Sequence, residues 1–79
     1  MNWIATFYSH FGAIRYMKQC KEAGLPARLT PVPRDLSSSC GTCVRYESEE
    51  PFSPASEEIE QIAEVTADGY RIRFRAENS

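Results

Sequence analysis

Apolar residues recur along the chain with two different periods, which divide its first half into a strand, a helix and a second strand. Residues 3–8 are rich in aromatic and β-favouring residues and contain no breaker, so they predict a strand that ends where Ser9 can cap a helix. From His10 to Ala23 the apolar positions fall on one helical face, and Gly24 is suited to end that helix. Residues 27–32 then alternate apolar and polar side chains, which predicts an edge strand.

The second half predicts a loop, a strand, a second helix and a last strand. Residues 33–41 follow neither period and are rich in turn formers, whereas residues 42–46 favour β-structure. Ser53-Pro54 is typical of a helix start, and Asp68-Gly69 of its end. The apolar face of this predicted helix consists of Ala55, Ile59, Ile62, Ala63 and Thr66. Residues 70–75 alternate apolar and arginine side chains, the clearest strand pattern in the chain.

This order of elements, β-α-β-β-α-β, predicts an α+β ferredoxin-like fold. In that fold a two-layer sandwich places both helices on one face of a four-stranded antiparallel sheet. A chain of 79 residues with 42% hydrophobic residues suits one domain, covering residues 1–79, in which we expect residues 76–79 to fray.

Composition predicts a cytoplasmic protein with reduced thiols and no membrane partner. No apolar stretch approaches the roughly 20 residues that a membrane span needs, and the start, from Met1 to Ile4, lacks a secretory signal pattern. The three cysteines are an odd number, which is atypical of a disulfide scaffold. The net charge of −2 gives no global reason to bind nucleic acid.

Cys40 and Cys43 form a C-x-x-C motif, which is typical of a redox pair, half a zinc site, or a turn entering a strand. The β-favouring residues that follow argue against a thioredoxin site, where a helix follows the first cysteine. Zinc needs four ligands, and only Cys20 and His10 could join the motif. Because Cys20 lies on the apolar face of the first helix, we expect no metal site within one chain, and zinc could bind only across a redox- or metal-responsive dimer.

The turn around Cys40 is the best candidate for chemistry. Its neighbours supply hydroxyl and backbone N–H groups that could form a small anion-stabilising nest around a reactive thiolate. These neighbours are Ser37, Ser38, Ser39 and Gly41. The alternative is that the serines and the glycine only make a turn.

Several segments resemble the selenium/sulfur carrier protein-like family over residues 3–46, and more loosely through the second predicted helix. The segments are Phe7-Tyr8-Ser9, Ala13, Glu22-Ala23-Gly24-Leu25-Pro26, Pro31-Val32-Pro33-Arg34, Ser37-Ser38-Ser39-Cys40-Gly41 and Arg45-Tyr46. The most specific element is Val-Pro-Arg followed by Ser-x-Cys-Gly.

The resemblance implies a carrier, or a sulfurtransferase-like protein rather than a conventional enzyme, without a cofactor. It would hold sulfur or selenium as a persulfide or selenopersulfide on Cys40, between a cysteine desulfurase and selenophosphate synthetase. Cys43 is not part of the family pattern, and the hypothesis that it is a resolving thiol depends on its spacing alone.

An arginine-rich face is the basis of an alternative function. If the apolar residues of 70–75 face the helices, the intervening arginines face outward, and two arginines of other predicted strands join them. The set is Arg28, Arg45, Arg71, Arg73 and Arg75. It could bind RNA or an acidic protein, contact a second copy in a homodimer, lower a nearby cysteine pKa, or simply be solvated. Nucleic acid is disfavoured because residues 42–46 lack the paired aromatics on which bases stack.

Overall fold

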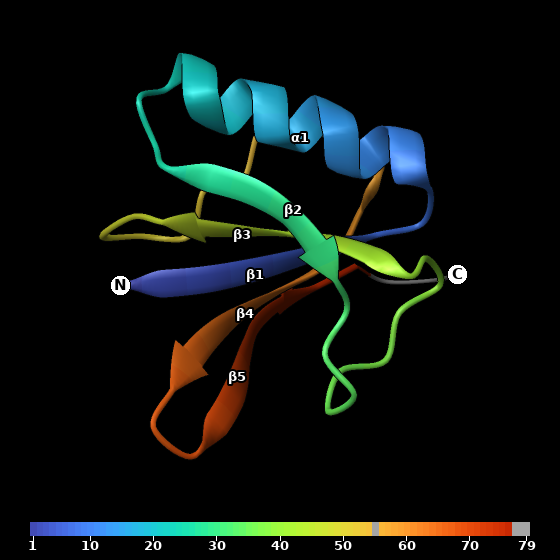
Figure 1. The fold of residues 1–79 in the computed structure, drawn as a ribbon, viewed down its shortest axis with the longest axis vertical. Helices are drawn as coiled ribbons and strands as arrows, with labels where there is room; N and C mark the ends of the chain where they lie inside the picture. Colours follow the sequence, from blue (N-terminus) through green and yellow to red (C-terminus); the bar gives the residue numbers. More distant parts are fainter. Residues whose placement is uncertain (55, 77–79) are drawn as a thin grey trace.

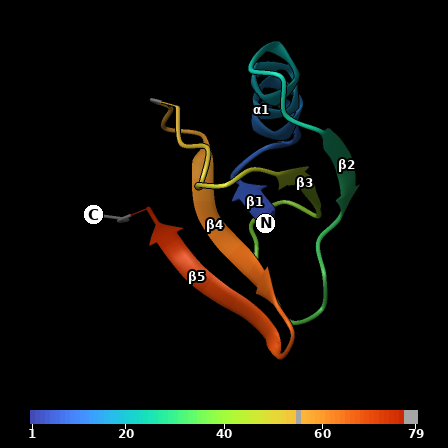
Figure 2. The same ribbon diagram turned by 90° about the vertical axis from the view of Figure 1, so that its left-hand side faces the viewer.

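A computed structural model describes residues 1–54 and 56–76. In these residues the chain forms β1 (Asn2–Phe7), α1 (His10–Glu22), β2 (Ala27–Pro31), β3 (Thr42–Glu47), β4 (Ile59–Thr66) and β5 (Gly69–Arg75). The strands pair antiparallel in one sheet, in the order β2-β3-β1-β4-β5. Helix α1 lies over one face of the sheet and contacts β1, β2 and β3 (Figures 1 and 2). Among the described residues, no helix is long and apolar enough to cross a membrane.

The core lies between α1 and the face of the sheet that it covers, which we call the helix face. The Ser9 side chain accepts a hydrogen bond from the Gly12 N–H at 3.2 Å, so Ser9 caps the helix as predicted. The helix buries Ala13, Tyr16 and Cys20 against alternate residues of the strands. Those strand residues are Trp3, Ala5 and Phe7 of β1, Val44 and Tyr46 of β3, and Ile59 and Ile62 of β4.

The predicted ferredoxin-like fold is wrong, because residues 59–66 form a strand instead of the second helix and the sheet has five strands. Phe7 pairs with Ile59 whereas Thr6 pairs with Gln61, so Glu60 is the extra residue of a β-bulge. Since the bulge adds one residue, Ile59 and Ile62 both lie on the helix face although they are three positions apart. A strand with a bulge therefore reproduces the apolar spacing of a helix.

Neither predicted end of the second helix bounds a helix, since Ser53 and Pro54 lie in a segment without regular secondary structure. Asp68-Gly69 belongs to a tight turn that joins β4 to β5, in which Thr66 pairs with Gly69 and Gly69 has a φ of 139°. Ala55, placed on the apolar face of the predicted helix, lies outside the described residues. Of the four residues expected to fray, Ala76 donates its N–H to the Glu60 carbonyl at 2.9 Å, and the other three lie outside the described residues.

The opposite face of the sheet, which we call the loop face, is covered by the segment between β2 and β3. Ile4, Thr6 and Cys43 alternate with helix-face residues, so they lie on this second face, and each is 0% exposed. The covering segment, residues 32–41, is called the Cys40 loop below. Its docking on the sheet is what places the candidate site.

Candidate functional site

Short hydrogen-bonded turns shape the Cys40 loop. At its base the Val32 N–H donates to the Gly41 carbonyl at 3.0 Å, and near its start the Leu36 N–H donates to the Pro33 carbonyl at 3.1 Å. The Cys40 N–H donates to the Ser38 Oγ at 3.2 Å, so a serine side chain closes the turn that presents the cysteine. The ends of the loop are thus fixed beside the ends of β2 and β3.

The Glu60 carboxylate fastens the middle of the loop to the sheet. Its Oε2 accepts from the Ser39 Oγ at 2.7 Å and from the Ser39 N–H at 3.2 Å, and its Oε1 accepts from the Thr6 Oγ1 at 3.0 Å. Burial alone would raise the pKa of Glu60, but hydrogen bonds from Ser39, Ser38 and Thr6 outweigh it and lower that pKa below its usual value. Glu60 therefore binds the loop as a carboxylate at neutral pH.

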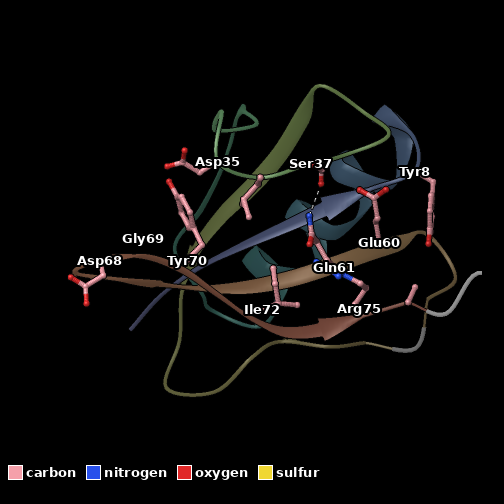
Figure 3. A pocket seen from close by; sticks show the side chains of 12 residues that line it. Tyr8, Asp35, Ser37, Glu60, Gln61, Asp68, Gly69, Tyr70, Ile72 and Arg75 are labelled. Atoms are coloured by element: carbon pink, nitrogen blue, oxygen red, sulfur yellow. Dashed lines mark hydrogen bonds between the residues drawn. The ribbon is translucent and has the colours of Figure 1, made fainter.

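Gln61 supplies a second attachment next to the first. Its Nε2 donates to the Ser37 carbonyl at 2.7 Å (Figure 3). Ser37, Glu60 and Gln61 also line an open cavity of about 640 Å³ between the loop and β5. The rest of its lining is Tyr8, Asp35, Leu36, Asp68, Gly69, Tyr70, Ile72, Arg75 and Ala76.

Three donors of the predicted anion nest are already engaged elsewhere. The Ser39 N–H and hydroxyl face Glu60, and the Cys40 N–H faces Ser38, so these groups are not directed at the Cys40 thiol. Gly41 has a negative φ and open space where a Cβ would lie, so neither conformation nor crowding demands a glycine there. The serines therefore hold the loop in place, and this is their principal role in the structure.

The three cysteines differ sharply in access. Cys40 is partly exposed, whereas Cys20 and Cys43 are each 0% exposed. Burial raises the pKa of the Cys20 thiol to about 11. Burial also raises the pKa of Cys43, although a hydrogen bond with Thr30 and the positive charge of Arg45 partly offset the effect.

The Cys43 thiol is also held by polar contacts inside the sheet. Its Sγ lies 3.2 Å from the Thr30 Oγ1 and 3.6 Å from the Pro31 carbonyl oxygen, to which it donates. Cys43 therefore lies in β3 as predicted, but its thiol is fully buried on the loop face, against Thr30 and Pro31 of β2.

The five arginines do not share one face, so the premise of the alternative function is wrong. A bulge at Arg73 shifts the pairing, because Ile62 pairs with Phe74 whereas Ala63 pairs with Ile72. The Arg73 guanidinium consequently lies 5.5 Å from the centre of the Trp3 ring, on the helix-face side.

The strand pairing shows on which face of the sheet each of the other four arginines lies. Arg71 pairs with Glu64, which itself pairs with Trp3, so Arg71 also lies on the helix-face side. Arg75 pairs with Gln61 on the loop face. Arg28 and Arg45 pair with each other across β2 and β3, also on the loop face. Ile72 pairs with Ala63, which pairs with Ile4, so Ile72 lies on the loop face, whereas Phe74 pairs with Ile62 on the helix face. The prediction that both face the helices in the core is therefore wrong, and Ile72 and Phe74 are 37% and 40% exposed.

Glu60 and Gln61 are the site residues that sequence reasoning missed. The predicted helix does not include them in its apolar face, so the sequence predicts no contact between them and the loop. Their signal is the pair of consecutive polar residues between Ile59 and Ile62, which interrupts a strand's alternation where a bulge can occur. In residues 1–54 and 56–76, no three His, Cys, Asp or Glu side chains gather as a metal site.

Comparisons with known proteins match most of the chain. A family model described as "Putative Se/S carrier protein-like" matches residues 2–68, which include both the Cys40 loop and β4. The chain is also 34% identical over 60 residues to the uncharacterized protein YtiA of Escherichia coli (strain K12). That alignment covers 76% of this chain and 65% of YtiA, so the chain spans slightly less than two thirds of that relative. No solved structure matches.

Proposed function

Because the chain belongs to the Se/S carrier protein-like family, we propose that it carries sulfur or selenium as a persulfide or selenopersulfide on the Sγ of Cys40. The observation that supports this choice of residue is exposure. Cys40 is the partly exposed cysteine, and the thiols of Cys20 and Cys43 are buried. A carrier thiol must reach sulfur on two other proteins in turn, which a buried thiol cannot do.

Loading on Cys40 needs no external oxidant or reductant. The Cys40 thiolate attacks the terminal sulfur of a persulfide on a donor, such as a cysteine desulfurase. A bond forms between Cys40 Sγ and that sulfur, the donor's S–S bond breaks, and the donor cysteine leaves as a thiolate. The protein then carries the same sulfane sulfur that the donor carried, and a selenopersulfide forms in the same way.

Unloading by transfer to another protein fits the structure better than release through Cys43. In transfer, a nucleophile of an acceptor, for example selenophosphate synthetase, attacks the terminal chalcogen and Cys40 leaves as a thiolate. Release through Cys43 would need its thiolate to attack Cys40 Sγ, but this thiol is buried and its pKa is raised. We therefore propose that Cys43 acts as a resolving thiol only when the Cys40 loop opens.

Intact mass after incubation with a cysteine desulfurase and cysteine or selenocysteine tests the proposal. The wild-type chain should gain the mass of one sulfur or one selenium atom, and a thiol reductant should remove it. Cys40→Ser should abolish the gain, whereas Cys20→Ser and Cys43→Ser should retain it. Loading that persists in Cys40→Ser would show that another residue is the acceptor, and no loading of the wild type would contradict the carrier function.

A further inference from the structure

We infer that Glu60 is a latch that positions Cys40, and that breaking it exposes a loaded Cys40 to attack by Cys43. This inference depends on the proposed function only in what Cys40 carries, because the latch itself is a property of the unloaded protein. Glu60 thereby has a role in the carrier site although it lies 20 positions from Cys40 in the sequence, on strand β4.

The bulge is what allows Glu60 to act on the loop. In a regular strand, consecutive side chains point to opposite faces of the sheet, so only one of Glu60 and Gln61 could reach the Cys40 loop. Because Glu60 is the extra residue, both side chains contact the loop, at Ser39 and at Ser37. Figure 3 shows the two side chains side by side beneath the loop.

The latch is firm on both of its sides. On the sheet side, the hydroxyl of the fully buried Thr6 donates to Oε1 of Glu60. On the loop side, the N–H and the hydroxyl of Ser39 both donate to Oε2. Hydrogen bonds to an ionised carboxylate are stronger than those between neutral groups, and Ser39 directly precedes Cys40. Restraining Ser39 therefore restrains the carrier thiol.

Without the latch, Cys40 would lose its sulfur or selenium before reaching an acceptor. Cys40 and Cys43 are three residues apart, a spacing at which disulfides form when the chain between them is free to adjust. If the Cys43 thiolate attacks the Sγ of a loaded Cys40, a Cys40–Cys43 bond forms, the bond to the terminal chalcogen breaks, and hydrosulfide or hydroselenide leaves. The latch opposes this step because it holds Ser39, and with it the neighbouring Cys40, on the sheet, while the Cys43 thiol stays buried against Thr30 and Pro31.

The unloaded protein provides the first test. In Glu60→Ala, hydrogen exchange at the Ser39 amide should be about tenfold faster or more, since that amide loses a charged acceptor. Disulfide formation between Cys40 and Cys43 with diamide, a thiol oxidant, should also be faster. Glu60→Gln keeps a carbonyl acceptor, so its rates of amide exchange and of disulfide formation should lie between those of the wild type and Glu60→Ala. Glu64→Gln is the matched control, because Glu64 is on the same strand but bonds Arg73 instead of the loop.

A loop-side variant keeps the inference falsifiable if Glu60→Ala does not fold. Ser39→Ala removes the hydroxyl donor without touching the sheet, and it too should accelerate formation of the disulfide. If Glu60→Gln and Ser39→Ala both form the disulfide at the rate of Glu64→Gln, Glu60 is not a latch. After loading, faster release of hydrosulfide from Glu60→Gln would support the inference, and release at the wild-type rate would overturn its functional half. Failure to load would instead contradict the proposed function, while the exchange and oxidation results would stand.

Discussion

Thiol labelling of the wild-type protein should follow the order Cys40 first, with Cys43 and Cys20 far behind. The perturbation is a limiting amount of iodoacetamide, which reacts with thiolates that it can reach. Cys40 is partly exposed, whereas the other two thiols are fully buried and have raised pKa values. Limited access and raised pKa values therefore both slow the labelling of Cys20 and Cys43.

The size of the difference can be calculated for Cys20. Burial raises its pKa from 9.0 to about 11. At pH 7.5 the thiolate fraction is therefore about a hundredfold lower than for an unperturbed thiol, because each pKa unit changes it about tenfold. This factor is a lower limit on the protection, since the reagent must also reach a side chain that is 0% exposed. Labelling of Cys20 should then rise about tenfold per pH unit until the pH approaches 11.

Peptide mapping after short labelling times measures all three rates in one sample. A denatured sample supplies the control, because unfolding should bring the three cysteines to similar rates. The reasoning would be refuted if Cys20 in the native protein were labelled within about tenfold of Cys40 at pH 7.5. It would be refuted equally if Cys43 were labelled before Cys40, because the Cys43 thiol would then not be buried in solution.

Three further predictions concern stability, each measured by urea unfolding. Tyr16→Phe should cost about 1 to 3 kcal/mol, because the Tyr16 hydroxyl donates to the carbonyl of Phe52. Gly12→Ala should destabilise the fold by about 1 kcal/mol, since a Cβ there would lie 2.9 Å from the Glu58 Cβ, and overpacking outweighs the gain in helix propensity. The pKa of Cys20 is about 11 in the folded state, above its unfolded value of 9.0, so folding disfavours the thiolate. The resulting contribution to the free energy of unfolding, about 2 to 3 kcal/mol, is fully present below pH 9.0 and is lost as the pH rises to about 11. Cys20→Ala should therefore lose less stability than the wild type between pH 9.0 and about 11.

The elements that the sequence predicted correctly are those set by local chemistry. Ser9 caps α1, and Cys20 lies in the core on the predicted apolar face of that helix. The ends of strands β1 and β3 lie within one residue of the predicted ranges, because β-favouring runs next to turn formers leave few alternatives. The position of Cys40 in an irregular loop was predicted for the same reason.

The elements that were predicted wrongly depend on partners far away in the chain. Whether residues 59–66 become a helix or a strand is decided by pairing with β1, which offers its second edge to them. The bulges at Glu60 and Arg73 are likewise visible only once the partner strand is known. The bulge at Glu60 gives a strand the apolar spacing of a helix. The bulge at Arg73 places on different faces of the sheet the arginines that simple alternation predicts on one face.

The bulge at Glu60 connects the error in the fold with the missed part of the site. Without it, a strand that kept Ile59 on the helix face would also place Gln61 there and would move Ile62 to the loop face. A buried amide without a partner costs free energy, and so does an isoleucine removed from the core. The Ile-Glu-Gln-Ile sequence thus fits this sheet only with one extra residue, and that residue is the carboxylate that holds the Cys40 loop. The interruption that makes the segment resemble a helix is the same one that turns Glu60 toward Ser39.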